Sequence, residues 1–596
     1  MRMRSITAVW CMCAVLLVLR IVSLPRTMLT WDVFGYYLYL PATVIHHDPA
    51  LKDHAWLDEV MTTYEPSSTL YQVVDAPNGG GRVIKYSAGM AIAYAPFFFI
   101  AHGAAHVLGH PADGFSAPYQ VILTFGCLFY ALAGLFLLRK VLLHFFSDGW
   151  TAAVIALTVF GTNYLQLTAF GGTLLTHSFL FTLYAALLLA TIRWHEQPTF
   201  KHALIIGACA GFITLVRPSE AVCLLIPALW LPAGPDAWRR KWTLLRTHGV
   251  QLVIAACTFV VLLLPQALYW HTVTGEWLFY SYVNPGEGFE FSSPYLWKFL
   301  IGFRKGWLVY TPIMLFALAG FVMLWRQRRD VFRALLLFFL ADLWVIASWS
   351  CWWYAGGSFS SRSIVPAYVA LAMPLGLCVQ ALWKRRSTRI AGAVSLGGLV
   401  LLNLFQTWQF EHGIISRERM TRAYYKAIFG RTSIPSGAEE LLLVDRPTTA
   451  QERFTDEARY TAHELCHFTF DDRPDSVFTL SAQDPYTPGP DVRYADLTGR
   501  DHAWLRATAR LWVDSTTTDP PVIVMTFHHD GQTYKYRTSA DTIPGGTRNT
   551  WVTLRMDYLT PEVRSTDDNL KVYLWDQHGG TCRVDDLRVD VFERID

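Results

Sequence analysis

The chain has 596 residues, of which 53% are apolar and only 16% are Asp, Glu, Lys or Arg. Soluble proteins carry about 25% charged residues, so this composition excludes a single soluble globular protein and also a disordered chain. The charge is unevenly distributed, because residues 1–430 carry 32 basic and 19 acidic side chains whereas residues 431–596 carry 18 basic and 28 acidic. We therefore expect a polytopic α-helical membrane part followed by a soluble acidic domain.

The first part contains a series of apolar runs that are long enough to cross a membrane. Residues 6–24 follow Met-Arg-Met-Arg and no small-residue cleavage site comes after them, so we expect a retained first helix rather than a removed signal peptide. Together with this run we expect eleven membrane crossings within residues 1–410. The other ten runs cover about residues 118–138, 150–169, 173–192, 203–216, 219–233, 249–270, 306–325, 332–349, 363–382 and 390–409.

Residues 86–108 are apolar but contain Pro96 and two histidines, and the basic residues decide their position. If this segment does not cross, the short loops on one side of the membrane collect 16 Lys or Arg, against nine on the other side. Such an excess is typical of cytoplasmic loops. We therefore expect a helix on the outer face at residues 86–108, a cytoplasmic N-terminus, and long outer loops at residues 26–117 and 271–305. The protein is expected in the inner (cytoplasmic) membrane, with its C-terminal domain extracytoplasmic.

Asp32 follows the first helix closely, in Thr30-Trp31-Asp32-Val33-Phe34-Gly35-Tyr36-Tyr37, at the expected boundary between water and lipid. Partial removal from water makes a carboxylate more basic, which suits a general base acting on a substrate at the membrane surface. An interfacial belt of aromatic residues, with Asp32 capping the next helix, is equally compatible with these residues.

Basic side chains recur on the same predicted face. Their charged groups can donate hydrogen bonds to a lipid phosphate, whereas snorkelling to ordinary phospholipid is the alternative for any one of them. The candidate phosphate-binding residues are Lys85, Arg217, Arg304, Lys305 and Arg362. The candidate substrate-binding residues are Tyr36, Tyr37, Tyr86, His177, Trp352 and Glu287.

Three further polar features are weaker evidence for a functional site. Asp342 lies inside an expected span, where a charge is costly unless it is paired, and we expect a structural hydrogen bond there. His177 begins a span and is as compatible with a helix-end histidine as with a ligand. His46-His47-Asp48 contains metal-ligand residue types, but adjacent histidines usually point apart. No metal site is therefore assigned and no cofactor is predicted, with a divalent metal left open.

From about Val477 the apolar residues recur with a period of two, as in half-buried strands. We expect an extracytoplasmic all-β sandwich, jelly-roll-like, at residues 476–596, and before it a connecting region at residues 411–475 with a helix near residues 417–428. A hairpin turn is expected at Asp530-Gly531. The predicted strands cover residues 504–513, 521–527, 532–537, 551–556, 570–575 and 582–592.

Two further expectations concern this soluble part. Cys466 and Cys582 are its two cysteines and can form a disulfide in an oxidising compartment. Residues 583–589 resemble the last strand of jelly-roll carbohydrate-binding modules, although a purely structural sandwich is equally compatible.

Residues 1–410 resemble the GT-C superfamily of polyprenyl-phosphate-dependent membrane glycosyltransferases, on the branch of the protein mannosyltransferases and aminoarabinose transferases. Many members carry a second acid directly beside the loop aspartate, whereas Val33 follows Asp32 here, so the resemblance does not extend to a metal or paired-carboxylate role for this loop. The segments that carry the resemblance are Asp32 in the first outer loop, Lys85-Tyr86-Ser87-Ala88-Gly89, Ala95-Pro96-Phe97, Thr176-His177-Ser178, Arg304-Lys305-Gly306-Trp307 and Trp349-Ser350-Cys351-Trp352-Trp353-Tyr354.

The resemblance implies an inverting transfer of a sugar from a polyprenyl-phosphate donor to a hydroxyl of a glycan, lipid or protein acceptor. Asp32 would be the general base, and Arg or Lys side chains would hold the leaving phosphate. A polytopic transporter or flippase of lipid-linked glycans is the alternative, although no internal repeat of the kind common in transporters is visible. A membrane-anchored glycan receptor would need only one or two spans. Membrane lipids are expected partners and nucleic acid is not, because cytoplasmic loops explain the basic residues.

Overall fold

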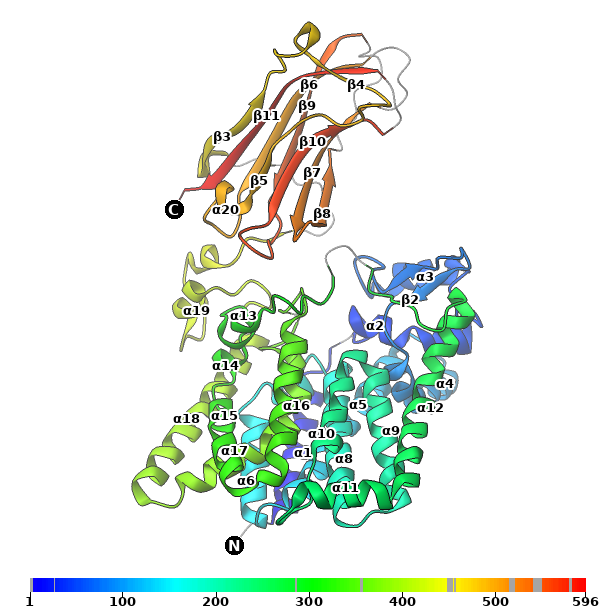
Figure 1. Ribbon diagram of the computed structural model, residues 1–596, viewed down its shortest axis with the longest axis vertical. Helices are drawn as coiled ribbons and strands as arrows, with labels where there is room; N and C mark the ends of the chain where they lie inside the picture. The colour runs from blue at the N-terminus through cyan, green and yellow to red at the C-terminus, as the bar shows by residue number, and fades with distance from the viewer. Residues whose placement is uncertain are drawn as a thin grey trace. The chain divides into compact units, whose positions relative to one another are not determined.

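The computed structural model describes residues 4–25, 27–283, 287–353, 357–446, 454, 457–513, 520–539, 549–577 and 581–595. The chain divides into two compact units. One unit comprises residues 1–283 and 289–441 and is helical; the other comprises residues 284–288 and 442–596 and is built from β-strands (Figure 1). Each unit is described by itself.

The helical unit is a bundle of apolar helices, with shorter elements at one of its ends (Figure 1). A two-stranded antiparallel sheet of β1 (Val73–Asp75) and β2 (Arg82–Ile84) lies in the long segment before α4. The long helices are α1 (Ser5–Val22), α4 (Gly89–Leu108), α5 (Ala117–Leu142), α8 (Thr176–Glu196), α9 (Phe200–Val216), α12 (Gly249–Thr274), α15 (Met314–Gln327), α16 (Arg329–Ala347), α17 (Tyr368–Leu382) and α18 (Arg386–Glu411). The shorter ones are α2 (Asp32–Tyr37), α3 (His54–Tyr64), α6 (Asp148–Phe160), α7 (Tyr164–Ala169), α10 (Leu225–Leu229), α11 (Ala237–Thr247), α13 (Leu296–Ile301), α14 (Trp307–Tyr310) and α19 (Arg422–Ile428), with 3₁₀ segments η2 (Pro218–Leu224) and η3 (Arg362–Ala367).

Seven helices in the described part of the chain are long and apolar enough to cross a membrane: α1, α4, α5, α8, α12, η3 with α17, and α18. This unit is therefore that of a multi-pass membrane protein. All eleven predicted runs contain helix, but several are short or interrupted. The run at residues 150–169 breaks between α6 and α7, and the run at residues 219–233 consists of η2 followed by α10. The total of eleven crossings stays a prediction.

Both flanks of α4 are tied to the segment that carries α2. Before α4, the carbonyl of Tyr86 accepts a hydrogen bond of 2.7 Å from the Tyr39 hydroxyl. After α4, the carbonyl of Gly114 accepts one of 2.5 Å from the Tyr37 hydroxyl. The helix itself is long enough to span and packs along the first half of α5, because the Tyr130 hydroxyl donates to the carbonyl of Ala93 at 3.1 Å and Nδ1 of His102 lies 2.5 Å from the Tyr119 hydroxyl. The placement of this segment on the outer face stays a prediction.

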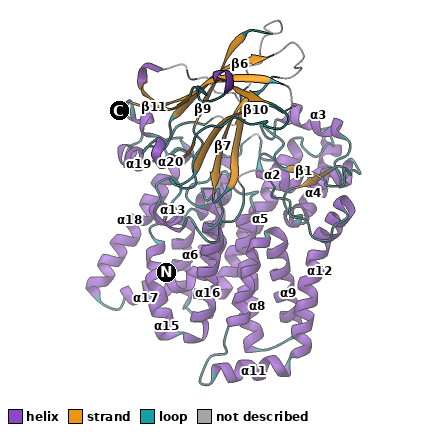
Figure 2. Cartoon of the chain, turned by 45° about the horizontal axis from the view of Figure 1, so that its top comes forward, coloured by secondary structure: helices purple, strands orange, loops and turns teal. Residues whose placement is uncertain are grey.

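The C-terminal unit consists of two antiparallel sheets, of four strands in the order β5-β10-β7-β8 and of five strands including β3-β11-β6-β9, with β4 paired to β11 (Figure 2). Its apolar core includes Leu505, Phe527 and Leu587, all fully buried. Asp530 and Gly531 have φ values of 46° and 77°, as a two-residue hairpin turn requires. The strands are β3 (Tyr460–Phe468), β4 (Phe478–Leu480), β5 (Asp491–Arg493), β6 (Trp504–Val513), β7 (Val522–His529), β8 (Gln532–Thr538), β9 (Trp551–Leu559), β10 (Asn569–Trp575) and β11 (Cys582–Arg594), with a helical turn α20 (Tyr494–Leu497).

All six predicted strands are confirmed, but the sheets begin earlier than expected. The region at residues 411–475, expected to connect the domains, contains α19 and also β3, which pairs with β11 along most of its length. The sequence of Tyr460–Phe468 shows no strand pattern, because polar residues interrupt its apolar ones and all but four of its side chains are exposed.

The expected disulfide between Cys466 and Cys582 does not form. Cys466 lies opposite Val589 of β11, seven residues along that strand from Cys582. At about 3.3 Å per residue this separation is about 23 Å, whereas disulfide-linked residues have Cα atoms only about 4–7 Å apart. The expectation was wrong because it counted cysteines without knowing the register.

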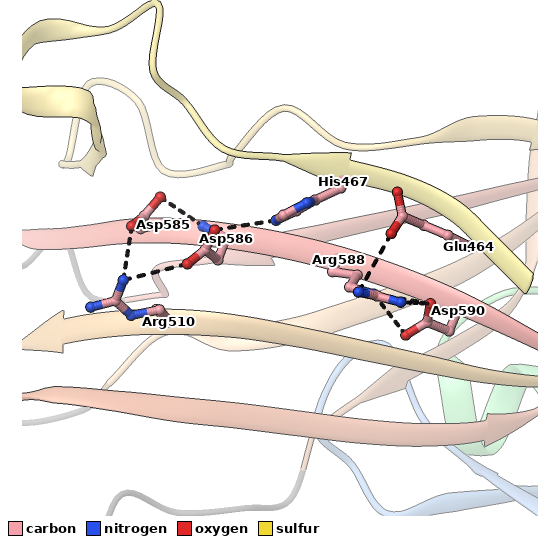
Figure 3. A network of polar contacts seen from close by, with 7 residues as sticks. All are labelled: Glu464, His467, Arg510, Asp585, Asp586, Arg588 and Asp590. Atoms are coloured by element: carbon pink, nitrogen blue, oxygen red, sulfur yellow. Dashed lines mark hydrogen bonds and ion pairs between the residues drawn. The ribbon is translucent and has the colours of Figure 1, made fainter.

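The solvent-facing side of the five-stranded sheet carries ion pairs within β11 and between β11 and its neighbouring strands (Figure 3). Arg588 contacts Asp590 at 2.8 Å and Glu464 at 3.5 Å, and Arg510 contacts Asp585 at 3.3 Å. These side chains are mostly a third to a half exposed, so each pair contributes little stability, about 0–1 kcal/mol.

Candidate functional site

The backbone at Trp31 fixes the start of α2. Trp31 has φ 53° and ψ −124°, a region that costs a non-glycine residue about 1–3 kcal/mol. The surrounding chain holds this conformation, because the Trp31 N–H donates to the carbonyl of Pro66 at 2.8 Å and its carbonyl accepts from the amide of Gln72 at 3.2 Å. The next residue, Asp32, is thereby placed at the first position of the helix.

Asp32 accepts three hydrogen bonds through its carboxylate. The hydroxyls of Tyr71 and Tyr86 donate to Oδ1 at 2.9 and 2.8 Å, and Nη2 of Arg362 donates to Oδ2 at 2.7 Å. The Asp32 side chain is 25% exposed and that of Arg362 is 9% exposed. The carboxylate is therefore oriented from three sides and still open to a ligand.

Burial raises the pKa of the Tyr71 and Tyr86 hydroxyls, and the negative charge of Asp32 raises both further. Both phenols consequently stay protonated and act as hydrogen-bond donors. Tyr36 packs on Tyr86 with a ring distance of 4.5 Å, which places this predicted substrate-binding residue at the edge of the same group.

Gly35 allows Tyr86 to reach Asp32. A Cβ atom added at Gly35 would lie 2.4 Å from the ring of Tyr86 and 3.0 Å from the side chain of Gln72. Any other residue at this position would force the ring to move, and so the hydroxyl that binds Asp32.

Lys85 lies beside the two tyrosines. Its side chain is almost fully buried, and its Nζ lies 5.0 to 5.9 Å from the ring centres of Tyr282, Tyr71 and Tyr86. Such distances allow cation–π attraction. The structure thus brings two of the predicted phosphate-binding residues, Lys85 and Arg362, to Asp32.

A second basic group surrounds Lys305, which is 2% exposed and donates to the carbonyl of Ser358. Burial lowers the pKa of Lys305 to about 7, and the charges of Arg362, Arg304 and Arg417 act in the same direction, while Glu418 opposes them. The guanidinium of Arg304 lies 4.0 Å from the ring centre of Trp353 and donates to the carbonyl of Glu418 at 2.6 Å. Trp352, predicted to bind substrate, is 5% exposed and packs edge-to-face on Trp353.

Arg217 belongs to a third group inside the bundle. It contacts the carboxylate of Glu220 at 3.4 Å, and Glu220 accepts a hydrogen bond of 2.7 Å from the Tyr184 hydroxyl. His177, in the first turn of α8, is 4% exposed, and its Nδ1 has no hydrogen-bond partner within the described ranges. Asp342 is 2% exposed and interacts electrostatically with Glu220 and Arg217. The structural hydrogen bond expected for it stays a prediction.

Two further residues were predicted to bind substrate. Tyr37 is fully buried, donates to the Gly114 carbonyl and packs against Phe115 at 5.5 Å, so its ring fills the core below α2. Its role as a substrate contact stays a prediction. Glu287 groups with the C-terminal unit, and its role as a substrate contact stays a prediction.

The described residues contain no group of three or more His, Cys, Asp or Glu side chains that could hold a metal ion. In the motif His46-His47-Asp48, the ring of His46 stacks on Trp56 at 4.1 Å. The stacking gives this histidine a packing role.

Sequence reasoning missed Tyr71, Tyr282 and Arg417. Tyr71 lies in the long segment before β1, where no periodic pattern or motif marks a single tyrosine. Arg417 follows α18 in a region treated as a connection, although its charge acts on Lys305. A search for every basic or phenolic residue in the outer segments would have included all three residues.

No family model and no curated protein matches this chain. The solved structures that are similar to it include the following three. The ArnT structure from Cupriavidus metallidurans bound to undecaprenyl phosphate has 15% identity, covering 72% of this chain and 66% of that chain, with a TM-score of 0.39. The Archaeoglobus fulgidus oligosaccharyltransferase has 12% identity, coverages of 76% and 61%, and a TM-score of 0.41. The arabinosyltransferase EmbB from Mycobacterium smegmatis has 11% identity, coverages of 98% and 64%, and a TM-score of 0.34.

The chain thus spans somewhat less than two thirds of the length of each of these structures. At these identities and TM-scores the likeness carries no argument about this chain. The function below is argued from the side chains around Asp32.

Proposed function

We propose that this protein is a membrane glycosyltransferase that moves a sugar from a polyprenyl-phosphate donor to an acceptor hydroxyl, with Asp32 as the general base. The observation that carries the proposal is the arrangement of Asp32, a partly exposed carboxylate oriented by two phenols and one guanidinium at one end of an apolar bundle. A general base must lie within hydrogen-bond reach of the proton that it takes, and a quarter-exposed carboxylate can accept one from an incoming hydroxyl.

The reaction begins when Asp32 takes the proton of the acceptor hydroxyl. The acceptor oxygen attacks the anomeric carbon of the donor sugar and forms the new glycosidic bond. The bond between that carbon and the phosphate oxygen breaks on the opposite face, so the configuration inverts. The polyprenyl phosphate leaves with the electron pair of the broken bond, and the proton stays on Asp32 until water removes it.

Arg362 and Lys305 supply the charge that stabilises the leaving phosphate. The guanidinium of Arg362 is paired with the carboxylate of Asp32 at 2.7 Å. A donor phosphate offers oxygens that compete for the same guanidinium, and its arrival would free Oδ2 of Asp32 for the acceptor. Binding of the donor would in this way prepare the base.

Replacement of Asp32 by Asn tests the proposal. General-base help contributes about 10²- to 10⁴-fold, so we expect Asp32→Asn to lower the rate of sugar transfer from a polyprenyl-phosphate sugar by at least about 10²-fold. Asp75→Asn is the matched control, because Asp75 lies in the same segment with its side chain 92% exposed. Undiminished transfer by a correctly inserted Asp32→Asn protein would refute the assignment.

The orientation in the membrane is part of the proposal. The excess of basic residues in short loops favours a cytoplasmic N-terminus, with Asp32 and the donor on the outer face of the inner membrane. A reporter fused after Asp596 that is active only in the cytoplasm would overturn this orientation.

A transporter or flippase of lipid-linked glycans is the second candidate, because one observation favours it. Glu220 and Asp342 lie buried inside the bundle beside Arg217, and ionisable residues at such positions often serve transport. In that case Asp342→Asn would abolish movement of a labelled lipid-linked sugar between leaflets, and Asp32→Asn would leave this movement unchanged.

A further inference from the structure

Helix α11 (Ala237–Thr247) lies at the end of the bundle away from α2 (Figure 1). It connects α10 to α12, and in both views it runs across the ends of α8 and α9 (Figure 2). Its sequence, Ala-Trp-Arg-Arg-Lys-Trp-Thr-Leu-Leu-Arg-Thr, contains four basic residues and no acidic one. The function proposed above uses none of these residues.

Lys241 attaches one face of α11 to the bundle. This lysine is 4% exposed; its Nζ lies 2.6 Å from Nε2 of His195 and donates to the carbonyl of Pro227 at 2.9 Å. The ring of Trp194 lies 6.0 Å away. A buried ammonium with these partners fixes the rotation of the helix, and therefore fixes which residues face outward.

The residues on the outward side are Arg239, Trp242, Thr243 and Arg246, which line an open cavity of about 470 Å³. Trp242 is 59% exposed. Arg239 and Arg246 form no ion pair and no side-chain hydrogen bond within the part of the chain that the structure describes. Arg240, which lies on the next face, differs because its guanidinium donates to the carbonyl of Ala233 at 2.5 Å.

The position of α11 determines what can meet this surface. It joins an apolar helical segment to the long apolar helix α12, so it lies where a membrane meets water. Tryptophan is enriched at that depth, and guanidinium groups there meet lipid phosphates. Arg239 and Arg246 are seven residues apart, about 10.5 Å along the axis, and two long side chains that converge across this distance can share one phosphate.

We propose that Arg239, Trp242, Thr243 and Arg246 form a binding site for the phosphate of an anionic phospholipid, in the leaflet opposite to Asp32. The two arginines supply charge-assisted hydrogen bonds, and the Trp242 indole packs along the glycerol and the first acyl carbons. The Thr243 hydroxyl donates to the carbonyl of Arg239 at 3.0 Å and lines the site between the two arginines. The site binds a lipid of the surrounding membrane and takes no part in sugar transfer.

Native mass spectrometry of the full-length protein tests this site. The protein is purified in detergent with added phosphatidylglycerol or phosphatidylcholine, and the fraction that carries each lipid is measured. We expect wild-type protein to retain phosphatidylglycerol preferentially, and Arg239→Gln/Arg246→Gln to bind it more weakly, on the order of tenfold. The matched control is Arg385→Gln/Arg386→Gln, which removes two exposed arginines from another basic loop and should retain the lipid as wild type does.

Three results would overturn the proposal. The first is equal retention by Arg239→Gln/Arg246→Gln and wild type, and the second is an equal loss in the control variant, which would indicate attraction by net charge alone. The third is displacement of the lipid by millimolar inorganic phosphate, which would indicate a site for a soluble anion. Unchanged size-exclusion profiles and melting temperatures of the variants show that they are folded, and Trp242→Ala, which keeps both charges, should also weaken retention.

Discussion

At the scale of single residues, the Asp32 carboxylate depends on neighbours that come from distant parts of the chain. Tyr71 and Tyr86 belong to the long segment after α1. Arg362 lies 330 residues after Asp32, at the start of η3. The two phenols hold Oδ1 and leave the orientation of Oδ2 to Arg362. The geometry therefore assigns positioning to the tyrosines and charge compensation to the arginine.

Tyr86→Phe removes one donor to Asp32 and keeps the ring that packs on Tyr36. Hydrogen bonds to charged groups contribute about 1.5–3 kcal/mol, so we expect the rate of sugar transfer to fall about 10- to 100-fold. The acceptor concentration needed for half-maximal rate should change less than the maximal rate. Steady-state kinetics of transfer measure both, and Tyr280→Phe, at a tyrosine that is 62% exposed, should behave as wild type.

Lys305 predicts a pH dependence of donor binding. Its pKa in the folded protein is about 7, below the ordinary lysine value of 10.5, so the ammonium that would bind phosphate is lost as the pH rises through about 7. Donor affinity should fall over this range, and it should fall much less in Lys305→Arg, whose guanidinium stays charged. A pH-independent donor affinity in wild type would contradict a role for Lys305 in phosphate binding.

The same lowering of the Lys305 pKa has an opposite effect on stability. Between pH 7 and 10.5 the unfolded chain binds a proton at Lys305 that the folded protein has released. Stability should therefore rise with pH across this window as far as Lys305 is concerned. Donor binding and stability respond in opposite directions because the first needs the charged form and burial favours the neutral one.

At the scale of elements, the site depends on the close approach of α2 to the segment before α4. Gly35 of α2 touches the ring of Tyr86, and Gly89 at the start of α4 touches the backbone of Val216 at the end of α9. Both contacts leave no space for a Cβ atom. Small residues at these points allow three segments to meet around Asp32.

Gly35→Ala should displace Tyr86 and lower the rate of sugar transfer at least about tenfold, although alanine favours a helix more than glycine does. Gly103→Ala is the control, because Gly103 is also helical and has no atom within 4 Å of an added Cβ. Thermal unfolding of both variants should show whether the loss of activity comes from a local change at Tyr86 or from a less stable protein. Full activity in Gly35→Ala would mean that the Tyr86 hydroxyl is not needed.

Several elements could be predicted from the sequence because a strong local pattern defines them. The strand Trp504–Val513 alternates buried and less buried side chains as its sequence does, and Asp530-Gly531 carries its own turn signal. The strand Tyr460–Phe468 lies at a sheet edge with mostly exposed side chains, so no apolar alternation marks it. Its pairing with β11 is a tertiary contact, which local patterns do not encode.

The candidate site was predictable only in part. Asp32, Lys85, Tyr86 and Arg362 have short motifs or a shared predicted face, and the structure brings them together. The pairing of Arg362 with Asp32 itself depends on how η3 packs against the first outer segment. The spacing of residues in the sequence does not show how close Arg362 and Asp32 lie in the folded protein.

At the scale of the whole molecule, the two units differ in the kind of side chains that they expose and in their net charge. The helical unit buries apolar side chains in a bundle with many exposed apolar residues, whereas the β unit has its own core and a solvent-facing layer of ion pairs (Figure 3). Residues 1–430 carry a net charge of +13 and residues 431–596 one of −10, counted from their basic and acidic residues. Each unit therefore has the composition of a separately folding domain.

The β unit should fold without the helical unit. Residues 442–596 expressed alone should be soluble and show a cooperative thermal transition, because the core around Leu505, Phe527 and Leu587 is complete within this segment. Circular dichroism should report β-structure with a single melting step. A molten or aggregated product would mean that the sandwich needs the helical unit to fold.

The outer-face position expected for helix α4 would give the helical unit unequal widths in the two halves of a bilayer. In the expected topology α4 lies on the outer face, where its exposed Phe99, Ile100, Val107 and Leu108 would meet acyl chains of the outer leaflet alone. A helix inserted on one side only acts as a wedge, and such insertion is sensitive to the curvature of the surrounding bilayer. Because α4 begins three residues after Tyr86, whose hydroxyl donates to Asp32, we expect the rate of sugar transfer to depend on how the surrounding lipids pack.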